Sequence, residues 1–223
     1  QLYPDARSAH LREAIAAKTG VGADEVFAGV GSDEVIATLL TALVRPRVKN
    51  LVPTVLTTTP SFVMYRQSAR ARGLNVIEVP LDAEWDLAES SMLKALEMTP
   101  PNVVFIATPN NPTGNLMSRD RLERVIQAAA GALVVVDEAY IDYSSGDHLD
   151  LYRKYENVAL LRTLSKVGFA ALRVGWLIAR PGLVGELDKV RLPYNLPSVS
   201  QSIATTVLTE LGGEVAAIAA AVK

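Results

Sequence analysis

Short apolar runs alternate with segments of helical spacing along most of the chain. The runs are apolar throughout rather than at every second position, which is typical of strands buried on both faces of a sheet. Helices that alternate with such strands indicate an α/β fold, with a mostly parallel sheet covered on both sides. The segments that predict strands are 26–30, 49–53, 75–79, 102–107, 132–136, 158–161 and 174–179.

Helical spacing is the second recurring pattern, and Gly20 supplies a stop signal after the first helical segment. No internal repeat, low-complexity tract or flexible linker interrupts the alternation. A single domain over 1–223 is therefore the simplest interpretation. Helices are predicted at 8–19, 35–44, 60–73, 119–131 and 215–222.

Composition narrows the classes of protein to consider. The 223 residues carry a formal net charge of −2, which gives no electrostatic footprint for nucleic acid or an anionic membrane. There is no cysteine, and the only histidines are His10 and His148, so we expect no metal site. No apolar run reaches the roughly 18 residues of a membrane span. We expect a cytoplasmic protein.

Polar side chains follow three of the predicted strands at their carboxyl ends, which is where ligands bind in open α/β sheets. They are Asn111, Asp137 and Lys166. A lysine in such a place is expected to be partly desolvated, which makes a neutral amine available for a Schiff base with an aldehyde cofactor. A lysine taken at random is far more often a solvated surface residue, so this hypothesis depends on its neighbours.

Asp137 follows three valines, and an isolated aspartate in that place is usually a helix cap. Its functional alternative is a buried anion that faces the cationic ring nitrogen of an electron-sink cofactor. Tyr140 lies three residues further on, so one helical turn would bring its hydroxyl to the same ligand. Its alternative is an ordinary half-buried tyrosine.

A second set of residues is suited to an anion. Gly31, Ser32 and Asp33 open a predicted helix, where free amides and a serine hydroxyl make a phosphate cradle, although a plain helix cap would use the same residues. Ser165 and Arg173 would add a hydroxyl and a guanidinium, and Arg173 is equally suited to a structural ion pair.

Two further candidates stand beside turn and helix signals. The segment 110–114, Asn-Asn-Pro-Thr-Gly, predicts a turn, and the open question is whether Asn111 also donates to a ligand. Phe62 is either a core aromatic or a flat surface for a cofactor ring.

Taken in order, four motifs resemble the fold-type-I aminotransferases that depend on pyridoxal 5′-phosphate (PLP). The sequence around these motifs is most similar to the histidinol-phosphate aminotransferases. It includes Tyr3-Pro4, Gly31-Ser32-Asp33-Glu34 and Pro60-Ser61-Phe62. The resemblance covers nearly the whole chain. It implies a three-layer α/β/α sandwich, the PLP-binding large domain, with one antiparallel strand near 174–179. The four motifs are Asn-Pro-Thr-Gly at 111–114, Asp-Glu-Ala-Tyr at 137–140, Ser-Lys at 165–166 and Leu-Arg-Val-Gly at 172–175.

The resemblance implies a role for each candidate. Lys166 would hold PLP and later move a proton between the substrate's alpha carbon and the cofactor, while Asp137 would pair with the pyridine nitrogen. Tyr3 would reach the phosphate in the other subunit, which implies a homodimer with shared active sites. The catalytic residues would be Lys166, Asp137 and Tyr140. The ring would be contacted by Asn111, Tyr140 and Phe62, and the phosphate by Gly31, Ser32, Asp33, Ser165 and Arg173.

The implied reaction is transamination of histidinol phosphate with 2-oxoglutarate, which gives imidazole acetol phosphate and glutamate in histidine biosynthesis. Related sites leave other functions open. These are an aromatic or broad-range aminotransferase, a threonine-phosphate-type decarboxylase and a non-catalytic PLP-sensing domain of a transcriptional regulator.

The chain also departs from the family pattern. The spacing between Lys166 and Arg173 is one residue shorter than in many relatives, and 55–59 resembles a small insertion ahead of Phe62. We expect a fragment that lacks the family's amino-terminal arm and its carboxy-terminal small domain. The residues that grip the substrate's carboxylate or phosphate would lie in that missing domain.

Overall fold

The computed structural model describes residues 3–46, 49 and 51–222. The chain forms two compact units, which we call the first and the second unit. Helix α2 (Gly31–Ala42) and strand β6 (Val158–Thr163) have residues in both. The first unit contains Gln1–Thr38, Ala139–Asp147 and Leu161–Lys223, and the second contains Leu39–Glu138 and His148–Leu160.

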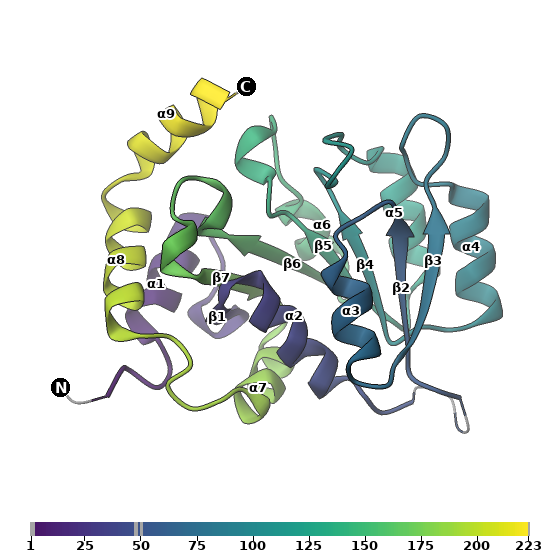
Figure 1. Ribbon diagram of the computed structural model, residues 1–223, viewed down its shortest axis with the longest axis horizontal. Helices are drawn as coiled ribbons and strands as arrows, with labels where there is room; N and C mark the ends of the chain where they lie inside the picture. The colour runs from purple at the N-terminus through teal and green to yellow at the C-terminus, as the bar shows by residue number, and fades with distance from the viewer. Residues whose placement is uncertain (1–2, 47–48, 50, 223) are drawn as a thin grey trace. The chain divides into compact units, whose positions relative to one another are not determined.

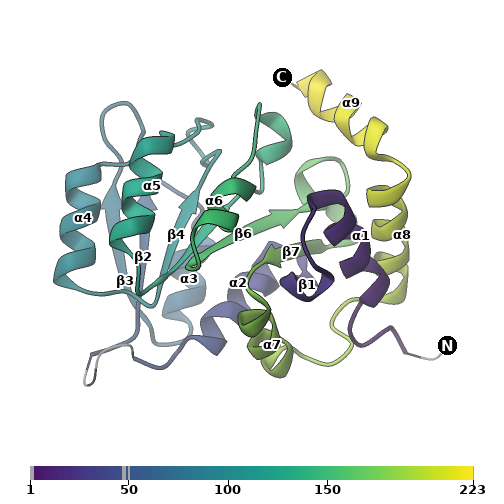
Figure 2. The same ribbon diagram turned by 180° about the vertical axis from the view of Figure 1, so that it is seen from behind.

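The second unit is a parallel sheet with helices on both faces. Its strands follow the order β6-β5-β4-β2-β3, and the β2–β3, β2–β4 and β4–β5 pairs are parallel. Helix α3 (Met64–Arg70) covers one face, and α4, α5 and α6 cover the other (Figures 1 and 2). The remaining bounds are β2 (Thr54–Thr59), β3 (Asn75–Pro80), β4 (Val103–Ala107), β5 (Leu133–Asp137), α4 (Glu89–Met98), α5 (Arg119–Ala128) and α6 (Leu149–Lys154).

The first unit is built around strands β1 (Val26–Val30) and β7 (Val174–Ile178), which pair antiparallel. The strand order here is β1-β7-β6, and helix α1 packs against α8. The remaining helices are α1 (Ala9–Thr19), α7 (Pro181–Val190), α8 (Ser198–Thr209) and α9 (Gly212–Val222), with 3-10 turns η1 (Ala23–Glu25), η2 (Ile141–Tyr143), η3 (Leu164–Lys166) and η4 (Ala170–Leu172).

The apolar runs form strands that are buried on both faces of the sheet. All of β4 is buried, and so are Val134 to Val136 of β5, because a parallel sheet with helices on both faces leaves no solvated side. The α/β class with mostly parallel strands is confirmed, and β7 is the expected strand with an antiparallel partner.

Two predicted elements were placed wrongly. The strand expected at 49–53 is not found there: position 50 lies outside the described residues, and 51–53 are not strand. The strand is β2 at Thr54–Thr59, which includes the segment that resembled an insertion. Its threonines are β-branched, which favours a strand, although they make the run less apolar than its neighbours. The helix expected at 60–73 is shorter and consists of α3 alone.

Among the described residues, no single helix is both long enough and apolar enough to cross a bilayer. The pair α8 and α9 reaches that length and composition only when the two are taken together, and they are bent by 81° at the break between them.

Candidate cofactor site

The predicted site residues fall into two groups, one in each unit, and each group is described by itself. The first unit holds Gly31, Ser32, Asp33, Tyr140, Ser165, Lys166 and Arg173, together with Tyr3. The second unit holds Phe62, Asn111 and Asp137.

In the first unit, strand β1 leads directly into α2 through Gly31, whose φ is +71°. The Gly31 amide donates to the carbonyl oxygen of Arg173 at 2.8 Å. A Cβ on Gly31 would lie 2.8 Å from Arg173 Nη2, and the positive φ itself favours glycine at this position. The first turn of α2 and Arg173 therefore lie close together, and their role in holding an anion stays a prediction.

The same turn is pressed against strand β7. A Cβ on Gly175 would lie 2.4 Å from the Ser32 backbone nitrogen, far inside van der Waals contact. Arg173 Nη2 lies 3.2 Å from Asp33 Oδ2, so the ion pair considered as its alternative role is present. Arg173 itself has a left-handed backbone, with φ 52° and ψ 50°. The Asp33 pair holds the guanidinium beside the α2 amides.

Lys166 sits at the end of η3, directly after β6. Thr163 shapes this turn, because its hydroxyl accepts from the Ser165 amide at 3.1 Å and lies 3.0 Å from the Val174 carbonyl oxygen. The Tyr143 hydroxyl donates to the Lys166 carbonyl at 2.5 Å. These bonds fix the backbone on both sides of the lysine side chain.

The lysine side chain points toward the predicted tyrosine. Lys166 Nζ lies 5.4 Å from the centroid of the Tyr140 ring, within the range of a cation–π contact. Lys166 is exposed, however, so the partial desolvation expected from its place at a strand end is wrong for this structure. The end of a strand fixes the position of the lysine backbone, whereas the burial of the side chain depends on which elements cover that end.

In the second unit, Asp137 is the last residue of β5 and is 4% exposed. Its Oδ2 atom accepts from the Tyr65 hydroxyl at 2.5 Å. Asp137 is therefore a buried carboxylate, and its pairing with a ring nitrogen stays a prediction. Tyr65, on α3, was not among the predicted site residues.

The turn after β4 separates the roles of its two asparagines. Asn110 is buried and committed to the turn: its Oδ1 accepts from Ser61 Oγ, and its Nδ2 donates to Pro60 O and Thr113 Oγ1. The neighbouring Asn111 is half-buried, and no hydrogen bond is recorded for its side chain within the described residues. Asn111 is thus the one of the pair that suits a ligand.

Phe62 lies between β2 and α3 and is half-buried. Its ring meets the Tyr65 ring edge to face, with centroids 5.5 Å apart and an interplanar angle of 83°. Glu138, next to Asp137, is buried and accepts from the backbone and Nδ1 of His148 at 2.8 and 2.9 Å. No group of three His, Asp or Glu side chains that would hold a metal occurs within the described residues.

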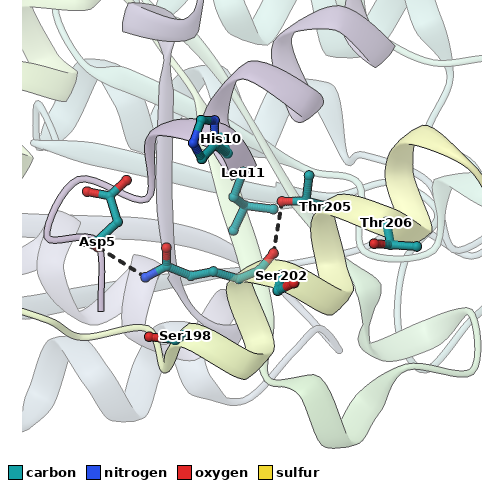
Figure 3. Close-up of a pocket in the computed structure, with 8 residues that line it drawn as sticks. Asp5, His10, Leu11, Ser198, Ser202, Thr205 and Thr206 are labelled. Atoms are coloured by element: carbon teal, nitrogen blue, oxygen red, sulfur yellow. Dashed lines mark hydrogen bonds between the residues drawn. The ribbon is translucent and has the colours of Figure 1, made fainter. Parts of the chain in front are cut away.

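Tyr3 belongs to the first unit and precedes helix α1. It is 65% exposed, and its ring stacks on Tyr194 with centroids 4.9 Å apart. Near it, a pocket of about 420 Å³ is lined by the segment before α1, by α1 itself and by α8. Figure 3 shows Asp5 and His10 on one side of this pocket and Ser198, Ser202 and Thr205 on the other. None of the predicted site residues lines it.

The chain was compared with known proteins. Residues 1–221 match the family described as aminotransferase class I and II. The histidinol-phosphate aminotransferase 1 of Burkholderia mallei is 42% identical over 207 residues, which are 92% of this chain and 57% of that protein. The histidinol-phosphate aminotransferase of Chromobacterium violaceum is 41% identical over 210 residues, 94% of this chain and 57% of that protein.

Solved structures show the same fold. The histidinol-phosphate aminotransferase from Sinorhizobium meliloti, solved in complex with pyridoxal-5′-phosphate, has a TM-score of 0.86 at 22% identity. The match covers 98% of this chain and 59% of that one. The chain thus spans a little over half the length of the relatives it matches.

Proposed function

Because the chain belongs to the class I and II aminotransferase family, we propose that the whole protein is a PLP-dependent histidinol-phosphate aminotransferase. The similarity to the two histidinol-phosphate aminotransferases carries this proposal. The reaction passes an amino group from histidinol phosphate to 2-oxoglutarate and yields imidazole acetol phosphate and glutamate, a step of histidine biosynthesis. Residues 1–223 belong to the PLP-binding large domain, and the protein is cytoplasmic.

The residues present suit each part of PLP. For the phosphate, the first unit offers the open amides of α2, the Ser32 and Ser165 hydroxyls and the Arg173 guanidinium. The missing side chains of Gly31 and Gly175 let Arg173 and strand β7 come close to the first turn of α2. For the ring, the second unit offers a buried carboxylate at Asp137 and the half-buried side chains of Phe62 and Asn111.

When bound, PLP supplies an electron sink for negative charge at the substrate's alpha carbon. Lys166 Nζ would hold the cofactor and, once the amino donor is bound, would serve as the base that moves the donor's alpha proton. The Asp137 carboxylate would favour a proton on the ring nitrogen. Tyr140 and Asn111 would donate hydrogen bonds to the ring oxygen, and Phe62 would present a flat face to the ring.

A homodimer with shared active sites is part of the proposal. Several large apolar side chains of the first unit are exposed, and the Tyr3–Tyr194 stack lies among them. Gln201 donates to the Asp5 carbonyl at 3.1 Å and so ties the segment that carries Tyr3 to α8. We infer that Tyr3 reaches the phosphate of the partner subunit. The exposed apolar side chains of this unit include Tyr3, Leu192, Tyr194, Val199 and Ile203.

The full-length protein provides the test. The visible absorption of bound PLP is followed while histidinol phosphate is added, with Lys166→Ala as the control. We expect a band that needs Lys166 and that disappears as the donor is consumed. A band that histidinol phosphate leaves unchanged would reject this donor and keep the PLP site. If no band forms with added PLP, the cofactor proposal is wrong.

A further inference from the structure

Tyr65 is a fully buried tyrosine whose hydroxyl meets the buried carboxylate of Asp137. It is 0% exposed, and its oxygen lies 2.5 Å from Asp137 Oδ2. The two residues are 72 positions apart, one on helix α3 and the other at the end of strand β5, and both belong to the second unit. Their contact is therefore set by the packing of α3 on the sheet.

The Tyr65 hydroxyl is the donor in this hydrogen bond. Burial raises the pKa of Tyr65 well above its usual value, and the charge of Asp137 and the hydrogen bond to it raise that pKa further. Burial and the neighbouring carboxylate thus both favour the protonated phenol, which is the form that donates. Its proton points to a carboxylate that has lost almost all contact with water.

Aromatic packing fixes where that hydroxyl points. The Tyr65 ring stacks on Phe105 with centroids 4.7 Å apart and an interplanar angle of 5°. A second aromatic ring, that of Phe62, meets the Tyr65 ring edge to face. A ring held by a stacked and a perpendicular partner has little freedom to turn, so the hydroxyl is held against Asp137 without a loss of side-chain entropy on ligand binding.

An ionised carboxylate that is 4% exposed needs hydrogen-bond donors, because burial disfavours its charged form. A neutral donor such as Tyr65 stabilises the charged form of the carboxylate and leaves its negative charge in place. A lysine or arginine would neutralise that charge. The charge is then retained for a cationic partner. In this respect a tyrosine suits a carboxylate that must pair with a protonated ring nitrogen.

We propose that Tyr65 is a positioning residue for the cofactor, which holds the Asp137 carboxylate ionised and oriented for the ring nitrogen while it braces Phe62 from behind. This inference rests on the proposed PLP site. Tyr65 need not touch the cofactor, since it acts through Asp137 and through Phe62. It thereby links the two residues that the proposed function assigns to the edge and the face of the ring.

The test uses the full-length protein and the variant Tyr65→Phe, which keeps both ring contacts and removes only the hydroxyl. Tyr152→Phe is the matched control, because Tyr152 is as buried and lies on α6 of the same unit. Asp137→Asn and the double variant complete a double-mutant cycle. The readouts are the dissociation constant of PLP, the pH at which acid releases PLP, and the thermal unfolding of the cofactor-free protein.

We expect Tyr65→Phe to weaken PLP binding roughly tenfold, the effect of one hydrogen bond to a charged group. Acid release should move upward by roughly one pH unit, because a carboxylate without its donor takes up a proton more readily. Tyr152→Phe should leave both values unchanged. Adding Tyr65→Phe to Asp137→Asn should weaken binding by less than threefold, since the hydroxyl then has no charge to hold.

Two results would overturn the inference. One is a Tyr65→Phe protein that loses thermal stability but binds and releases PLP like the wild type. The other is full additivity of the two substitutions, which would mean that Tyr65 does not act through Asp137. If wild-type protein shows no Lys166-dependent PLP band, the proposed function fails first, and that result is distinguishable from both.

Discussion

Arg12 on α1 and Asp188 on α7 form a two-pronged ion pair across 176 positions of the chain. The two bonds join Nη1 to Oδ2 at 2.9 Å and Nη2 to Oδ1 at 2.5 Å. Arg191 Nε adds a third bond to the same carboxylate at 2.8 Å. The pair is largely buried. It joins α1 to α7, a helix that lies much later in the sequence.

Removing one partner of this pair should be costly, because the other charge stays buried without compensation. We expect Asp188→Ala to lower the free energy of unfolding by about 3 kcal/mol. Glu186→Ala is the control, since the Glu186–Lys189 pair is exposed and should contribute less than about 0.5 kcal/mol. Urea unfolding of both variants measures the difference. Equal losses would show that the buried pair has no special weight.

The same carboxylate predicts a dependence of stability on pH. Burial alone would raise the pKa of Asp188, but hydrogen bonds from Arg12 and then Arg191 outweigh it, and the pKa lies below its usual value. A pKa that is lower in the folded state gives stability that is complete above the unfolded pKa of about 3.9 and is lost as the pH falls through the folded pKa. Asp188→Asn should therefore lose less stability on acidification below about pH 4 than the wild type does. Parallel acid-unfolding curves would contradict this.

Gly175 should tolerate no side chain. The alanine Cβ would lie 2.4 Å from the Ser32 nitrogen and 2.5 Å from the Gly31 carbonyl carbon, both of them backbone atoms. We expect Gly175→Ala to cost about 3 kcal/mol of stability or to displace the first turn of α2 and weaken PLP binding. Gly185→Ala, in the interior of α7 with nothing near its Cβ, should instead stabilise by about 0.5–1 kcal/mol. Thermal unfolding and PLP titration distinguish the two positions.

Strand β2 contains a buried threonine whose hydroxyl reduces the stability of the fold. Thr57 is buried, and its hydroxyl has no hydrogen-bond partner within the described residues. Valine has nearly the same shape without the hydroxyl, so Thr57→Val should raise the free energy of unfolding by about 1 kcal/mol. Thr54→Val should not, because the Thr54 hydroxyl donates to the Val52 carbonyl at 2.9 Å. A destabilised Thr57→Val protein would mean that the hydroxyl has a partner.

The proposed dimer makes Leu192 sensitive to charge. Leu192 is 72% exposed beside Tyr194, and a carboxylate there would have to be buried in the assembly. We expect Leu192→Glu to be monomeric by analytical ultracentrifugation. Met98→Glu is the matched control, because Met98 is also 72% exposed but lies at the end of α4 in the second unit. A dimer that survives Leu192→Glu would place the interface elsewhere.

The sequence predicted the elements whose pattern is local. Runs such as 102–107 and 132–136 became β4 and β5 because their side chains are apolar at every position. Strand β2 was missed because three of its buried side chains are threonines, whose hydroxyls hide the apolar run. Their β-branching was the available signal.

The pattern of apolar and polar positions could not predict contacts between segments that are distant in the sequence. For Asp137 the neighbouring residues left a helix cap and a buried anion open, and nothing near it in the sequence pointed to Tyr65 on a different helix. The exposure of Lys166 was likewise missed, because burial of a long side chain is decided by the elements that cover it. In both cases the residue type could be predicted and its surroundings could not.

The approach of β7 to α2 has a consequence for the study of variants. In a saturation scan of the whole chain, Gly175 should stand out as intolerant although it offers no functional group at all. Residues that are proposed to bind through a single hydroxyl, such as Ser32, should accept several replacements. Attempts to redesign the proposed phosphate site should therefore vary the donors and leave Gly175 untouched, because the approach of β7 to α2 leaves no room for a Cβ there.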